Sequence, residues 1–97
     1  MATYVVLVSF TDQGVRNIKQ TTERAKALAA AGTKLGVKVK DTFWTLGAYD
    51  AVLVADAPDD EAMTALCLSV GSLGNIRTQT MRAYSADEMS KILAKMP

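Results

Sequence analysis

The segment FWTLGAYDAVLVADA, residues 43–57, holds a strand, a short turn and a second strand. Pro58 follows directly and stops the second strand, because proline cannot donate a hydrogen bond to a neighbouring strand. The acidic residues 59–61 come next, and negative charge is favourable in the first turn of a helix. The segment therefore predicts a β-hairpin that leads into a helix, and this fixes the middle of the fold.

The chain on either side of this hairpin supplies the remaining elements. Residues 3–10, TYVVLVSF, predict a first strand, and Thr11 is placed to cap a helix that is interrupted at residues 21–22. Residues 76–84 predict a last strand, and the capping box of Ser85 and Glu88 begins a terminal helix. The order β, α, β, β, α, β is typical of the α+β, ferredoxin-like fold, with a four-stranded antiparallel sheet and helices on one face. We expect a single domain over residues 1–97.

The second face of this sheet needs a cover that the two helices cannot provide. The strands at residues 3–10 and 49–57 are apolar on both faces, and large exposed apolar patches mark interaction sites. A second copy of the chain, packed sheet to sheet, is the cover that we favour, and the terminal helix is the alternative. In the edge strand, residues 37–46, strict alternation places Phe43 in the helix-side core and Trp44 in the subunit contact.

Composition excludes several classes of function. The 11 basic and 10 acidic residues nearly cancel, so we expect neither nucleic acid nor an anionic membrane as a partner. The chain has no histidine and a single cysteine, Cys67, which leaves no histidine-based catalysis, no common zinc site and no internal disulfide. We expect no metal and no cofactor. Residues 4–8 lack the pattern of a secretory signal, which favours a cytoplasmic location.

Several short motifs resemble those of the GYD domain family, and together they span nearly the whole chain. The motif Gly47-Ala48-Tyr49-Asp50 is preceded by Phe43-Trp44-Thr45-Leu46. The other matching stretches are Gly14–Lys19, Arg24, Asp56–Glu61 and Gly71–Thr78. The resemblance implies a small bacterial protein with a ferredoxin-like fold, which associates through its sheet like the dimeric α/β-barrel proteins. The resemblance implies a fold, but it implies little about a reaction or a ligand.

Tyr49 and Asp50 have two interpretations. An aspartate beside a turn can accept backbone N–H bonds and so hold the turn, with Tyr49 supplying a packed ring. Alternatively, Tyr49 donates a hydrogen bond to a ligand, and Asp50 acts as a general base at the mouth of a cavity.

Arginines and one tryptophan complete the candidate site. Arg24, Arg77 and Arg82 could clamp an anionic ligand, and Trp44 could line its pocket. The competing interpretation pairs the arginines with nearby carboxylates, Asp50, Asp56 and Asp59. The ligand-binding candidates are therefore Trp44, Tyr49, Asp50, Arg24, Asp56 and Arg77.

Three classes of function remain open from the sequence. The first is a homo-oligomer that binds a small molecule in an apolar cavity near residues 47–50. The second is a dimeric α/β-barrel enzyme, an isomerase, decarboxylase or oxygenase, that uses Tyr49 with Asp50 or Asp56. The third is a structural or regulatory interaction protein without a ligand. The sequence does not decide whether the protein is an enzyme.

Overall fold

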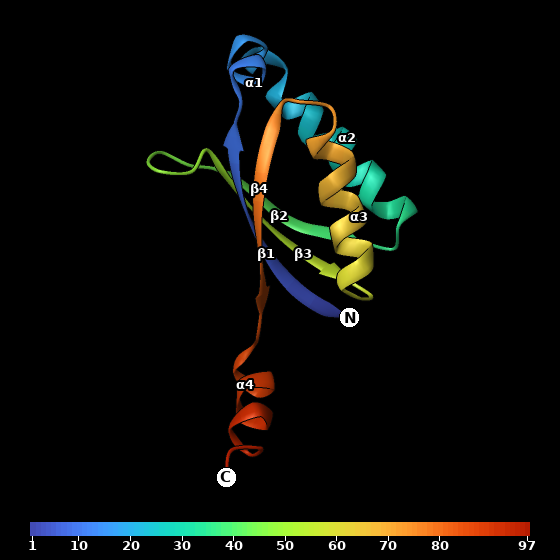
Figure 1. Ribbon diagram of the computed structural model, residues 1–97, viewed down its shortest axis with the longest axis vertical. Helices are drawn as coiled ribbons and strands as arrows, with labels where there is room; N and C mark the ends of the chain where they lie inside the picture. Colours follow the sequence, from blue (N-terminus) through green and yellow to red (C-terminus); the bar gives the residue numbers. More distant parts are fainter.

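The computed structural model describes residues 1–97 as one sheet with helices packed on one side (Figure 1). In chain order the elements are β1 (Ala2–Phe10), α1 (Asp12–Arg16), the 3-10 turn η1 (Ile18–Gln20), α2 (Thr21–Lys34), β2 (Lys38–Trp44), β3 (Ala51–Ala57), α3 (Asp60–Gly71), β4 (Ile76–Ala83) and α4 (Ala86–Leu93). The strands are ordered β2-β3-β1-β4, and all neighbours are antiparallel. This is the predicted ferredoxin-like arrangement.

Local capping explains where three helices begin. The Thr11 hydroxyl accepts the N–H of Gly14, and the Asp59 carboxylate accepts the N–H of Ala62 at 2.8 Å. Ser85 and Glu88 form the reciprocal capping box at the start of α4. Each bond satisfies a backbone donor that the helix itself leaves free. The sequence predicted the caps at Thr11 and Ser85, and it predicted Asp59 as a favourable negative charge at the start of its helix. No helix has both the length and the apolar character needed to cross a membrane.

The core lies between the sheet and the two long helices, α2 and α3. Alternate residues of β1 and β3 point into it, together with one residue before β2 and two from α3. These buried side chains are Tyr4, Val6, Val8, Val37, Ala51, Leu53, Ala55, Ala57, Met63 and Leu66. The opposite side of the sheet, which we call the far face, carries the other half of each strand.

A β-bulge in β2 reverses the predicted faces of Phe43 and Trp44. Val39 pairs with Ala55, but the next paired residue is Asp41, which pairs with Val54, so Lys40 is an extra residue. Beyond the bulge, Trp44 pairs with helix-facing Ala51 and therefore lies on the helix side. Phe43 lies on the far face, so the prediction that placed Phe43 in the core and Trp44 in a subunit contact is wrong.

The terminal helix does not cover the far face of its own sheet. β4 ends at Ala83, which pairs with Thr3 near the start of β1, and α4 continues past this edge of the sheet, so that the helix stands apart from the body of the molecule (Figure 1). The alternative in which this helix covers the second face is therefore wrong for the single chain. Within this chain, no helix covers the far face (Figure 1).

Candidate functional site

The far face carries an apolar strip that crosses all four strands. Cross-strand partners point to the same side of a sheet, so the register places these side chains next to one another. Phe43 is 59% exposed and Met81 is 48% exposed, whereas the side chains between them are half-buried. The strip consists of Phe43 from β2, Val52 and Val54 from β3, Val5 and Leu7 from β1, and Met81 from β4.

The loop between β2 and β3 is tied to the sheet by Asp50. Its carboxylate accepts the N–H of Phe10 at 2.8 Å, and its own N–H donates to the carbonyl of Val8 at 2.8 Å. Gly47 has a φ of +129°, a conformation that other residues rarely adopt. This geometry gives Asp50 the structural role that the first interpretation of the turn assigned to it, and Gly47 supplies the backbone conformation that the loop needs.

Tyr49 lies over the far face rather than over the helix-side core. Its hydroxyl donates to the side-chain oxygen of Gln79 on β4 at 2.8 Å, and its carbonyl accepts the Thr45 hydroxyl at 2.6 Å. Because β4 is the edge strand on the other side of β1, this hydrogen bond places the Tyr49 side chain across the apolar strip. The loop and the strip therefore form one surface.

Trp44 and Arg24 meet on the opposite side of the sheet. They line a small apolar hollow of about 50 Å³ between α2 and the sheet, where the indole N–H donates to the Thr21 hydroxyl at 3.0 Å. The Arg24 guanidinium donates to the carbonyls of Asn17, at 2.7 Å, and Gly14, at 3.2 Å. Pockets for small ligands are usually about 300–1,000 Å³, so this hollow fits only a very small group.

Asp56 and Arg77 lie at opposite ends of the far face. Asp56 accepts the Thr3 hydroxyl at 2.8 Å and forms an ion pair with Lys40 at 3.6 Å. Arg77 pairs in register with Ser9, which is about 20 Å along β1 from Thr3 at the usual rise of a strand. The two residues therefore do not meet. The guanidinium groups of Arg24, Arg77 and Arg82 do not converge on one site either.

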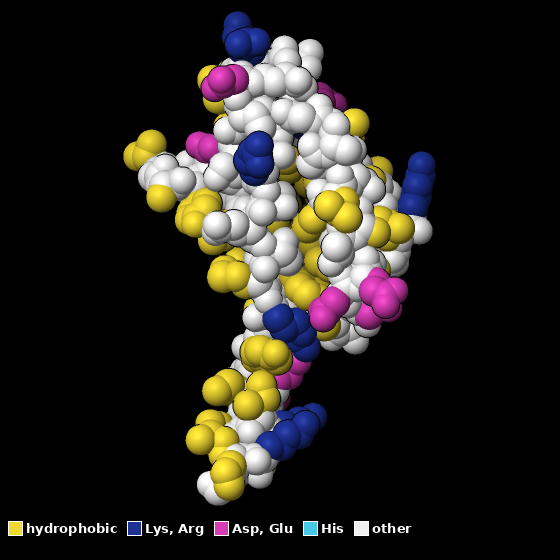
Figure 2. Space-filling model, viewed as in Figure 1, with side chains coloured by type: hydrophobic (Ala, Val, Ile, Leu, Met, Phe, Trp, Pro, Cys, Tyr) yellow, Lys and Arg dark blue, Asp and Glu magenta, His cyan; other side chains and the backbone are white.

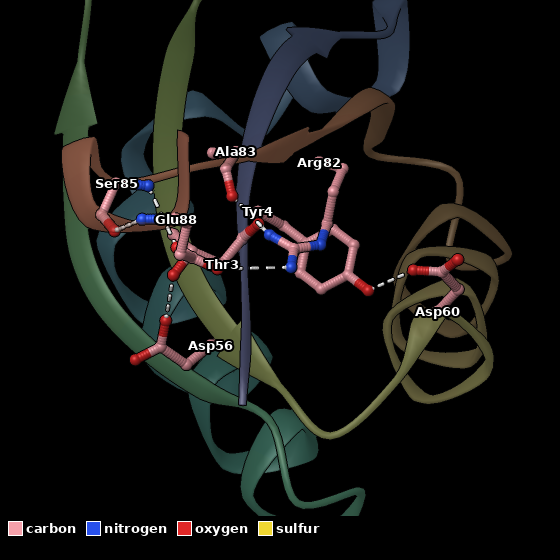
Figure 3. Close-up of polar contacts among 8 residues, drawn as sticks. All are labelled: Thr3, Tyr4, Asp56, Asp60, Arg82, Ala83, Ser85 and Glu88. Atoms are coloured by element: carbon pink, nitrogen blue, oxygen red, sulfur yellow. Dashed lines mark hydrogen bonds and ion pairs between the residues drawn. The ribbon is translucent and has the colours of Figure 1, made fainter. Parts of the chain in front are cut away.

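A polar cluster at the base of β4 was not identified from the sequence (Figure 3). The Tyr4 hydroxyl donates to the Asp60 carboxylate, which raises the pKa of Tyr4 above its ordinary value of 10.0. The Arg82 guanidinium lies 5.7 Å from the ring centroid of Tyr4 and 4.6 Å from that of Tyr84. It also donates to the carbonyls of Thr3 and Ala83. The sequence signal was weak, since only the cross-strand register brings Arg82 beside Tyr4.

An open groove of about 490 Å³ extends from this cluster between α3 and β4. The Cys67 thiol lies in it, 3.2 Å from the hydroxyl of Thr80. No group of three cysteine, aspartate or glutamate side chains is placed to hold a metal ion. The far face with its loop is therefore an apolar surface that no helix covers, and the groove is a concavity on the helix side that polar and apolar residues line together.

Comparison with known proteins agrees with this fold. The GYD domain family matches residues 4–93. A curated relative, the glutamine synthetase and cystathionine beta-lyase binding protein of Thermus thermophilus, is 32% identical over 90 residues, which cover 92% of this chain and 95% of the relative. The crystal structure of TTHA0845 from Thermus thermophilus superimposes with a TM-score of 0.57 at 26% identity, over 89% of this chain and 96% of that one.

A second solved structure, that of MtbAldR, shares only the fold. It superimposes with a TM-score of 0.66 at 14% identity, and the match covers 87% of this chain but 52% of that protein. The family match, by contrast, extends over almost the entire sequence, including the Gly47–Asp50 loop and the last strand. This chain belongs to the GYD domain family.

Proposed function

We propose that this protein is a homo-oligomeric binding protein that acts through protein–protein contacts. The observation that carries the proposal is the far face, whose apolar strip has no cover from any element of its own chain. Continuous apolar patches of a few hundred Å² on soluble proteins usually mark interaction sites. A second copy of the chain is the simplest cover, because two sheets can pack face to face about 10 Å apart.

An enzyme is the class of external partner that we propose. The relative from Thermus thermophilus is named as a protein that binds two enzymes, and it matches this chain over nearly its whole length. The site supports binding better than turnover. Asp50 and Asp56 are each engaged by neighbours in the fold, through Phe10 and Lys40, so neither carboxylate stands free beside Tyr49 as a base.

The test of self-association is a matched pair of variants. Phe43→Lys places a charge in the apolar strip, whereas Leu73→Lys makes the same kind of change at an exposed leucine on the helix side. Sedimentation velocity is expected to show an oligomer for the native protein and for Leu73→Lys, and monomer for Phe43→Lys. A native protein that is monomeric at about 100 μM, far above the Kd of a stable complex, would refute the proposal.

Binding of a small molecule is the second candidate function, and the hollow beside Trp44 is the observation that favours it. Its walls are apolar apart from Thr21, Arg24 and Thr42, so a small apolar group with one acidic or carbonyl oxygen would suit it. Trp44 is the sole tryptophan, and its fluorescence therefore reports on this hollow alone. Native mass spectrometry of freshly purified protein would detect a retained ligand together with the number of subunits.

Catalysis at the loop, the remaining class, has its own test. An isomerase, decarboxylase or oxygenase of the dimeric α/β-barrel kind would depend on the Tyr49 hydroxyl. Tyr49→Phe removes that hydroxyl and its bond to Gln79 but keeps the ring. Unchanged turnover of a candidate substrate by this variant would remove Tyr49 from catalysis.

A further inference from the structure

The terminal helix α4 carries an apolar face that contacts no core residue. Met89 and Leu93 are 43% and 53% exposed, and with Ile92 they recur at the three- and four-residue spacing of a single helix face. Met96, which is 67% exposed, continues this spacing just after the helix ends. The ion pair between Arg82 and Glu88, at 3.6 Å, joins the start of the helix to β4. Beyond that point the apolar face has no partner in its own chain.

A helix of this length needs a partner in order to be stable. It spans 8 residues, whereas isolated helices shorter than about 12–15 residues are marginal in water. The capping box at Ser85 and Glu88 helps the helix to begin, but it buries no apolar surface. Packing of the apolar face against another body would supply the missing stabilisation.

The direction of this face indicates which body that is. In Figure 2 the hydrophobic side chains of the lower, protruding arm gather on the left, and its lysine side chains lie on the right. In Figure 1 the long helices lie to the right of the sheet, so the left is the side of the far face. The apolar surface of α4 therefore faces the same side of the molecule as the apolar strip of the sheet.

The area of the far face gives an independent argument. β3 has 7 residues, and four strands of that length form a face of about 450 Å² at normal strand spacing. A stable dimer usually buries about 800 Å² on each partner. The three large apolar side chains of α4 and that of Met96 just after it, at about 100 Å² each, would raise the total to that size.

We propose that α4 is a dimerisation arm, which packs its apolar face on the second copy of the chain that covers the far face. The proposal rests on the self-association proposed above and adds the surface that completes it. In a two-fold symmetric dimer each copy gives one arm and receives one, so both arms are buried together.

Matched variants at adjacent positions test the arm. Leu93→Lys places a charge on the apolar face, and Ala94→Lys places the same charge on the opposite face one residue later. Leu93→Lys is expected to weaken the dimer at least tenfold by analytical ultracentrifugation, because both copies lose a buried leucine, whereas Ala94→Lys is expected to leave the Kd within about twofold. Circular dichroism of both variants confirms that the sheet is folded.

A photo-reactive phenylalanine analogue gives a second readout in the full chain. Placed at residue 93, it is expected to form a covalent dimer on irradiation, and placed at Lys91, on the polar face, it is expected to form little. If Leu93→Lys dimerised with an unchanged Kd, or if the analogue at residue 93 gave no crosslinked dimer, α4 would not be a dimerisation arm. The proposed sheet-to-sheet dimer would not be affected by either result. A native protein that is monomeric would overturn both.

Discussion

Gly14 shows how one missing side chain sets the position of the loop before β4. A Cβ atom at this residue would lie 2.1 Å from the carbonyl oxygen of Asn75, far inside van der Waals contact. The same carbonyl accepts the N–H of Thr11 at 3.1 Å, so it cannot move away without breaking a hydrogen bond. The start of α1 and the entry to β4 can approach this closely only because residue 14 is glycine.

Gly14→Ala is therefore expected to lower the free energy of unfolding by about 2–3 kcal/mol, the cost of forcing extra volume into a packed site. Gly71→Ala is the matched control. No atom lies within 4 Å of a Cβ at residue 71, and alanine favours the end of α3, so a neutral or slightly stabilising effect is expected. Urea denaturation of the two variants measures the difference, and equal effects would show that the contact with Asn75 is unimportant.

The stability of an Asp50 variant tests the structural role of this residue separately from any catalytic role. Asp50→Ala leaves the N–H of Phe10 without its acceptor and is expected to cost about 1–3 kcal/mol in unfolding free energy. Glu23→Ala removes an exposed carboxylate on α2 whose ion pair with Lys26, at 3.4 Å, is itself exposed, so a change within about 0.5 kcal/mol is expected. If Asp50→Ala were as stable as Glu23→Ala, the loop would not depend on this bond.

At the scale of elements, signals confined to neighbouring residues could be predicted from the sequence. The caps at Thr11, Asp59 and Ser85 each need only a side chain and a backbone N–H three residues later, and all three are present. The bulge at Lys40 could not be predicted, because no residue type marks it and it exists only relative to β3. One extra residue then reversed the faces of Phe43 and Trp44.

In the candidate site, too, features that depend on neighbouring residues could be predicted, whereas features that depend on strand pairing could not. The structural role of Asp50 was one of the two alternatives, because turn chemistry is local. Whether Asp56 and Arg77 meet depends on the register of β1 with both its neighbours, which alternation alone does not fix. The cluster of Tyr4, Asp60 and Arg82 needed the same non-local information.

The capping box of α4 predicts a pH dependence. The backbone N–H of Ser85 donates to the Glu88 carboxylate and lowers its pKa below the ordinary value of 4.5, with Arg82 adding to the effect. A carboxylate with a depressed pKa in the folded state stabilises above the ordinary pKa, and this contribution is lost as the pH falls through the folded value. The start of α4 is therefore expected to weaken only below pH 4.5.

Nuclear magnetic resonance can follow this titration directly at the Ser85 amide, whose proton shift depends on the charge of Glu88. The midpoint is expected below 4.5, and Glu88→Gln is expected to abolish the titration while keeping a neutral acceptor. A midpoint at or above 4.5 in the native protein would contradict the capping geometry.

At the scale of the whole molecule, the single chain is less compact than its length predicts. Its radius of gyration is 14.5 Å, whereas a compact domain of this length has about 12.5 Å. Only 12 of 97 residues are buried, because α4 stands apart from the core and no helix covers one face of the sheet. Such a chain gains much of its stability from whatever covers these surfaces.

This dependence predicts that thermal stability rises with protein concentration. For a dimer that unfolds to two chains, each tenfold increase in concentration adds about 1.4 kcal/mol, or about 3–6 °C in Tm for a two-chain unit of about 200 residues. Met81→Lys, in the apolar strip, is expected to remove this slope, and Leu73→Lys is expected to retain it. Differential scanning calorimetry from about 5 to 500 μM covers the range in which most dimers dissociate. A Tm that stays constant for the native protein would mean that the far face is exposed to water in the stable state, which is the opposite of what its apolar strip requires.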